Sequence, residues 1–154
     1  MTTPKFFLRF DLPKKPGDEI PNLPPYLDEL SDADLMALYS QMVAWVNYSK
    51  AEVVQAEVIE EYKLSALKQT EAFTLISQWD ITKKGDTVTM AKARRDVDTE
   101  VVICGTNHRE ARAYRKMVDT VFDRCERNAN VLSRELSRRI SLTPVERRLQ
   151  WTGP

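Results

Sequence analysis

The chain has 154 residues, of which 30% are charged and only 4 are glycine, and its 23 Lys and Arg balance its 23 Asp and Glu. One domain fits this length, and the composition favours long exposed helices over a sandwich or a Rossmann-type sheet. Because no run of 18 apolar residues exists and no signal-peptide pattern opens the chain, we expect a cytoplasmic protein that neither spans a membrane nor is secreted.

The charges are unevenly distributed along the chain. Residues 26–91 carry 5 Lys or Arg against 11 Asp or Glu, whereas residues 92–154 carry 14 against 9. An acidic front half and a basic rear half attract each other within a hairpin or between subunits, or the basic half faces an anionic partner. Ordinary solvation of a helix surface also explains such charges.

Residues 1–30 are expected to form an extended N-terminal arm. Six of the eight prolines lie there, and each of them disfavours helix. Within the arm, Phe6, Leu8, Phe10 and Leu12 alternate with other residues, as in a half-buried strand. We expect this strand to dock on the helices or on a neighbouring subunit; the alternative is a flexible leader.

A first helix is predicted over residues 31–79. Ser31 is a good N-cap, and Asp34 three positions later fits a variant of the capping box. Neither Gly nor Pro interrupts this stretch, so a single helix of about 48 residues is expected.

The helix pattern stops at residues 80–89, which are rich in β-branched residues and centred on Lys84–Gly85. This predicts a small β-hairpin or loop at the tip of an antiparallel, all-α helical hairpin covering residues 31–142. The second helix is expected to restart after Thr87 or Thr89 and to cover residues 90–142. Residues 143–154 read as a short C-terminal helix that opens on Pro144.

Apolar and small residues recur in the second helix with a 4-3 spacing from Val97 to Ile140, typical of a seam that faces a partner helix. The predicted oligomer seam consists of Val97, Val101, Cys104, His108, Arg115, Phe122, Cys125, Leu132 and Leu136. Forty-four helical residues span about 66 Å, whereas a globule of this chain length has a radius of gyration of about 15 Å. We therefore expect a coiled-coil-like homo-oligomer.

Enzymatic motifs are lacking, and no cofactor or metal site is expected. Cys104 and His108 stand at i, i+4, a spacing that suits thiol activation or one edge of a metal site. We favour structural roles instead, with small packing at Cys104 and a register-setting polar group at His108. Arg115 should pair with a carboxylate of the first helix or of a neighbouring subunit, because an unpaired buried guanidinium is costly.

Basic residues gather around the predicted tip. Lys83 and Lys84 lie in it, and Lys92, Arg94 and Arg95 follow within two helical turns. Such a cluster suits phosphates, and Trp79, with Phe73 near it in sequence, offers one base-stacking contact; ordinary solvation of the basic residues is the alternative.

The chain also resembles a family, the phage recombination mediators of the UvsY type, over about residues 35–140. The matching positions are Leu38-Tyr39-Ser40, Ala66-Leu67-Lys68, Phe122, Cys125, Ala129 and the Ser133-Arg134 region. The resemblance implies a helical protein that assembles into rings, binds single-stranded DNA and helps a RecA-like recombinase displace single-strand-binding protein. The family's DNA-contacting lysine is followed by an arginine two positions on, whereas Lys68 is followed by Gln69 and Thr70; a Lys-x-Arg occurs instead at Lys92-Ala93-Arg94.

The leading hypothesis is therefore a non-enzymatic recombination mediator, located in the host cytoplasm if phage-encoded. Its DNA-binding residues would be Lys68, Lys83, Lys84, Lys92, Arg94 and Arg95. The alternative is a coiled-coil scaffold, adaptor or chaperone that captures a protein through the Phe6–Leu12 arm or the Trp151 tail. An enzyme that uses Cys104 and His108 is a third hypothesis.

Overall fold

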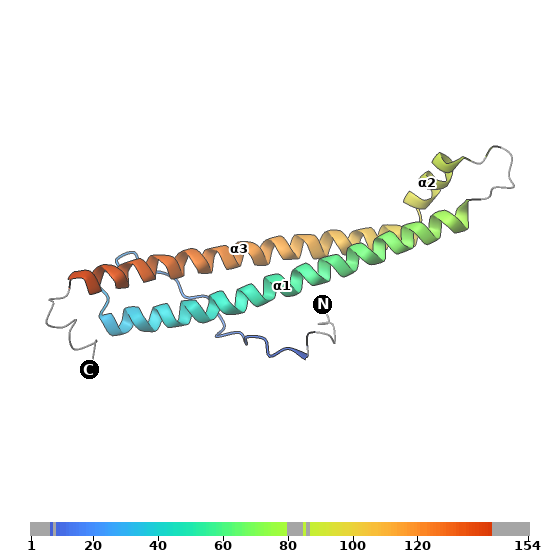
Figure 1. Ribbon diagram of the computed structural model, residues 1–154. Coiled ribbons are helices and arrows are strands. Elements are labelled where there is room, and N and C mark those ends of the chain that lie inside the picture. Colours follow the sequence, from blue (N-terminus) through green and yellow to red (C-terminus); the bar gives the residue numbers. More distant parts are fainter. Residues whose placement is uncertain (1–6, 8, 80–84, 86, 143–154) are drawn as a thin grey trace. The chain divides into compact units, whose positions relative to one another are not determined.

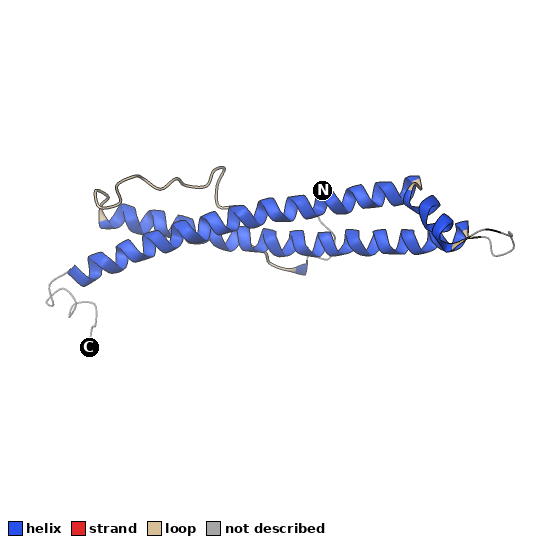
Figure 2. Cartoon of the chain, turned by 90° about the horizontal axis from the view of Figure 1, so that it is seen from above, coloured by secondary structure: helices blue, strands red, loops and turns tan. Residues whose placement is uncertain are grey.

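The computed structural model describes residues 7, 9–79, 85 and 87–142, and the regular structure within these ranges is helical (Figures 1 and 2). Helix α1 covers Asp32–Gln78, α2 covers Val88–Asp96 and α3 covers Thr99–Leu142. Helices α1 and α3 pack against each other in a hairpin-like arrangement. No helix in the described ranges is long and apolar enough to cross a membrane.

Helix α1 begins where the sequence predicts. The Ser31 hydroxyl accepts a hydrogen bond from the Asp34 amide at 3.1 Å and donates to the Asp34 carboxylate at 2.6 Å. This arrangement satisfies one of the amides left without a partner in the first turn. Asp32 and Asp34 in that turn also face the positive end of the helix dipole.

The predicted single helix over residues 90–142 is wrong, because the chain breaks between α2 and α3. The Thr87 hydroxyl caps α2 by accepting a hydrogen bond from the Met90 amide. A restart after Thr87 was one of the two positions that the sequence predicted. Helix α2 then ends at Asp96, with Val97 as its C-cap, and Asp98 caps α3 by accepting from the Glu100 amide at 3.0 Å. Aspartate is among the best N-caps, so it starts a new helix here.

The chain divides into two compact units, each of which contains a part of α1 and a part of α3. Unit 1 consists of Met1–Ala51 and Thr120–Pro154, and unit 2 of Glu52–Asp119. Within each unit the two helices run antiparallel. Asp32 pairs with Arg139 and Lys50 lies over the Phe122 ring in unit 1.

The core of unit 1 lies between α1 and α3. Its buried members are Leu35, Met42, Trp45, Cys125, Ala129 and Leu132. Cys125 and Leu132 are completely buried, so in this unit the 4-3 spacing of α3 faces α1 of the same chain. Burial raises the pKa of the Cys125 thiol. Ile20, Leu23, Leu27 and Leu30, which precede α1, pack against this cluster.

Arg139 holds the segment before α1 against the end of α3. Its guanidinium donates to the carbonyls of Leu27 and Leu30, at 2.7 and 2.8 Å, and to the Asp32 carboxylate at 2.7 Å. Its Nε donates to Glu135 at 2.9 Å. Hydrogen bonds from Arg138 and then Arg139 lower the pKa of Glu135 from 4.5 to about 2.

The strand predicted at Phe6–Leu12 is wrong for its described residues. The Phe10 amide donates to the Phe7 carbonyl at 3.1 Å and the Leu12 amide to the Phe10 carbonyl at 3.0 Å, so these groups are satisfied by local turns. Phe7 is buried and Phe10 is 54% exposed, the reverse of the predicted alternation. No second strand exists in the described ranges to pair with this segment.

Two further predictions lie largely or wholly outside the described residues. These are the β-hairpin or loop at residues 80–89 and the C-terminal helix at residues 143–154. Of the predicted tip, Gly85 is described with φ 101°, a left-handed conformation that glycine adopts without strain.

Candidate nucleic-acid interface

The basic residues predicted to bind DNA belong to unit 2. Lys68 is exposed on α1, and Lys92 and Arg94 are exposed on α2. Arg95 is partly buried and donates two hydrogen bonds to Asp96, at 2.6 and 2.8 Å. Lys83 and Lys84 lie outside the described residues. Of the described four, Lys68 and Lys92 make no ion pair with another described residue, whereas the charge of Arg95 is compensated.

Helix α2 is short but held in place at both ends. Thr87 caps its start, Ala91 is completely buried, and Arg94 donates to the carbonyl of Gln78 at 3.2 Å. The carbonyl of Gln78 belongs to the last residue of α1, where carbonyls lack intrahelical partners. Arg94 therefore joins α2 to the end of α1 while remaining exposed.

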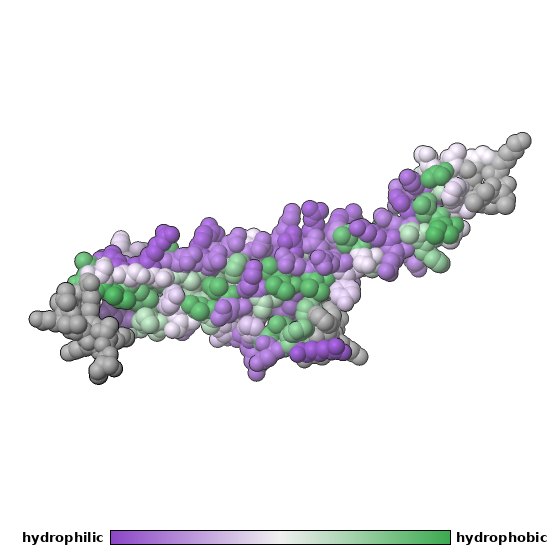
Figure 3. All heavy atoms as spheres, viewed as in Figure 1, coloured by the Kyte–Doolittle hydropathy of each residue, from purple (hydrophilic) through white to green (hydrophobic). Residues whose placement is uncertain are grey.

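Aromatic and apolar side chains accompany these cations. Phe73 and Trp79 at the end of α1 are 76% and 41% exposed, and Val88 and Met90 on α2 are also exposed. Figure 3 shows apolar residues at the surface of α2, next to hydrophilic ones. Bases of a single strand stack on exposed aromatic rings, and the backbone follows the cations.

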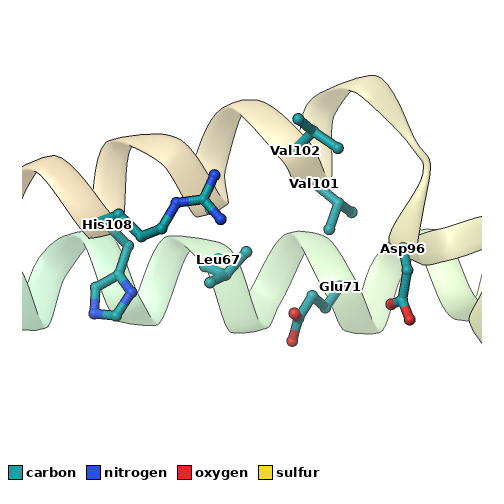
Figure 4. Close-up of a pocket in the computed structure, with 8 residues that line it drawn as sticks. Leu67, Glu71, Asp96, Val101, Val102 and His108 are labelled. Carbon is teal, nitrogen blue, oxygen red and sulfur yellow. The ribbon is translucent and has the colours of Figure 1, made fainter.

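A groove of about 440 Å³ lies in the same unit, and the sequence did not reveal it. Leu67 and Glu71 come from α1, Asp96 from the end of α2, and Val101 and His108 from α3; Val102, Gly105 and Arg109 complete the lining. The carboxylates of Glu71 and Asp96 point to the same side of the groove (Figure 4). Gly105, a glycine inside a helical pattern, was the one local signal of this site.

The polar members of the predicted seam have separate partners. The Cys104 sulfur lies 3.6 Å from the Thr70 hydroxyl, and His108 Nε2 lies 4.0 Å from Glu60 Oε1. No hydrogen bond between Cys104 and His108 exists in the part of the chain that the structure describes. The geometry thus brings together neither a thiol–imidazole pair nor, among the described residues, a group of three His, Cys, Asp or Glu suited to a metal.

Arg115 meets a glutamate of the first helix, as its place in the seam predicted. Its Nε lies 2.5 Å from Glu60, and its other nitrogen lies 3.8 Å from Glu57. Arg112 also approaches Glu60, at 4.0 Å. Glu60 therefore joins three cationic or titratable groups of α3 and sets the register of the helix pair in unit 2.

The first and last residues of the 4-3 run differ from the prediction. Val97 lies at the break before α3 and is 76% exposed, and Ile140 is 64% exposed. Val101, Ala111, Cys125 and Leu132 are buried within the chain. The inward-facing seam thus begins at Val101, because the break at Asp98 takes Val97 out of the helix.

No protein-family model matches the chain, and neither a curated protein nor a solved structure matches it.

Proposed function

We propose that this protein is a non-enzymatic recombination mediator that binds single-stranded DNA through unit 2. The observation that supports it best is the exposure of Lys68 and Lys92 without ion pairs among the described residues, with the Phe73 and Trp79 rings in the same unit. Cations for phosphates and rings for bases are the two requirements for single-strand binding. The resemblance to the UvsY-type mediators of phages agrees with this chemistry.

The proposal includes the finer architecture. Residues 31–142 form one antiparallel helical hairpin, preceded by an extended Pro-rich arm at residues 1–30; the tip of the hairpin lies before α2. Such hairpins assemble into a homo-oligomer in the cytoplasm, which is the host's if the protein is phage-encoded. The assembled protein binds single-stranded DNA and helps a RecA-like recombinase displace single-strand-binding protein from it.

The test is fluorescence anisotropy with a labelled single-stranded oligonucleotide over a series of salt concentrations. Each phosphate neutralised contributes about −0.7 to the slope of log affinity against log salt. The double variant Lys68→Gln, Lys92→Gln should therefore bind more weakly, with a slope smaller by about 1.4.

Lys14→Gln is the control for each single replacement, because it removes one positive charge from an exposed lysine of unit 1. Its slope should equal that of the unaltered protein. Absence of binding at low salt would refute the DNA-binding proposal, and a monomeric mass by light scattering at micromolar concentration would refute assembly.

A second function, a coiled-coil scaffold, adaptor or chaperone, is favoured by a different observation. Large apolar side chains are exposed on both long helices, among them Met36 and Tyr62 on α1 and Met117 on α3. Exposed apolar side chains are candidates for protein–protein contact where they gather into a patch. This function predicts a stable complex with a protein partner and no affinity for the oligonucleotide at low salt.

A further inference from the structure

Gly105 lines the groove of unit 2, although neither helix formation nor helix packing requires a glycine at this position. Gly105 lies seven residues into α3, where glycine is less favourable than alanine. A Cβ built at Gly105 would meet the Leu67 side chain at 4.0 Å, which is ordinary van der Waals contact. Close packing of α1 against α3 therefore does not explain the glycine. Its effect is to leave backbone open to the groove.

The groove also carries charges of both signs that form no ion pair among the described residues. Arg109 makes no ion pair with a described residue; its one hydrogen bond within the described ranges goes to Thr106, on its own helix. Glu71 forms neither a hydrogen bond nor an ion pair within the described ranges. An occupant should therefore offer an acceptor or a negative charge to Arg109 and a hydrogen-bond donor to Glu71.

The apolar part of the lining adds a shape requirement. Val101 is buried, and Leu67 is partly buried on the facing helix. Together with the bare backbone at Gly105 they leave room for a flat apolar face. A nucleobase has such a face, and its edge carries polar groups.

From these observations we propose that the groove holds one unstacked base of single-stranded DNA that bears an exocyclic amine, as cytosine does and thymine does not. The inference rests on the proposed DNA-binding function. The base lies against Leu67 and Val101 and over Gly105, its exocyclic amine donates to Glu71, and Arg109 contacts the adjoining phosphate. Acidic side chains accept from the amine of cytosine, whereas thymine presents a carbonyl at the same position.

The surrounding cations support a nucleic acid as the occupant. Lys68 is exposed on α1 of the same unit, and Lys92 and Arg94 belong to the helix whose last residue, Asp96, lines the groove. A strand held by these cations places its bases beside the groove. Asp96 Oδ1 is already occupied by Arg95, so Glu71 is the carboxylate that reads the base.

The experiment compares oligo(dC) and oligo(dT) of equal length by anisotropy at one salt concentration. The unaltered protein should bind oligo(dC) at least about fivefold more tightly, the lower end of the discrimination by one specific base contact. Gly105→Leu fills the groove and should reduce the preference to within about twofold, with the salt slope unchanged. Glu71→Gln should do the same and leaves every described hydrogen bond intact, so it tests the proposal if Gly105→Leu fails to fold.

Ala113→Leu is the control, because it adds the same side chain to an exposed position of the same helix. It should keep the oligo(dC) preference. Equal binding of both oligonucleotides by the unaltered protein, or an unchanged preference in Glu71→Gln, would overturn the inference while leaving DNA binding intact. A Gly105→Leu variant that changes only the assembly mass would also overturn it, because the groove would then be a protein interface. Absence of binding to either oligonucleotide would instead refute the proposed function.

Discussion

Replacing Leu132 by alanine should destabilise the protein strongly, and the loss should not depend on protein concentration. Leu132 is completely buried in unit 1, in one cluster with Leu35, Met42 and Trp45. Truncation of a buried leucine to alanine costs about 2–5 kcal/mol, depending on how far the cavity collapses. Because Met42 is flexible and able to fill part of the space, we expect about 2–4 kcal/mol.

The loss should appear as a lower urea midpoint by circular dichroism and as a fall in Tm of about 4–16 °C. Val131→Ala is the control. Val131 is the preceding residue, is 43% exposed, and gains helix propensity on substitution. Its free energy of unfolding should stay within about 0.5 kcal/mol of the original or rise.

Measurements at two protein concentrations tenfold apart separate packing within the chain from packing between chains. If Leu132 contacts α1 of its own chain, the free energy lost by Leu132→Ala is the same at both concentrations. A loss below about 1 kcal/mol would refute its burial. A loss that changes with concentration would place Leu132 in a subunit interface instead.

Three further predictions concern the charged groups. The pKa of Glu135, held at about 2, lies below its unfolded value, so its stabilisation is present above about pH 4.5 and is lost as the pH falls towards 2; Glu135→Gln should flatten this acid limb in urea midpoints measured against pH, and an unaltered limb would contradict it. Burial, and then Glu52 at 3.4 Å, raises the pKa of Tyr114 above 10, so Glu52→Gln should shift its phenol titration to lower pH in absorbance at 295 nm, with Tyr114→Phe identifying the signal. A double-mutant cycle of Arg115→Met and Glu60→Gln should give a coupling energy of about 0.5–3 kcal/mol by urea unfolding, and additive losses would show that the pair does not interact.

Local signals allowed prediction of the start of the first helix and of the restart at Thr87. Ser31 and Thr87 are capping residues, and capping depends only on the next few residues. The break at Asp98 was missed because the apolar spacing continues across it, from Val97 to Val101. Asp98, a favoured N-cap residue, starts a new helix there even though the apolar periodicity continues through it.

Features that depend on pairing between distant segments were predicted less well. The alternation at Phe6–Leu12 suggested a strand, but a strand requires a partner for its backbone hydrogen bonds. Arg115 was expected to find a carboxylate, yet only the register of α1 against α3 selects Glu60. The groove was not predicted for the same reason, because Glu71 and Gly105 meet only once that register is known.

The two cysteines fall in different units, so the alkylation rates of their thiols report local opening of each unit without any substitution. Cys125 is completely buried in unit 1, and Cys104 is partly buried in unit 2. The Cys125 thiol reacts with an alkylating reagent only when its surroundings open, and its raised pKa further slows the reaction at neutral pH, whereas the partly buried Cys104 reacts more readily. Mass spectrometry of the two alkylated peptides over time therefore shows whether α1 and α3 separate in one cooperative event or one segment at a time.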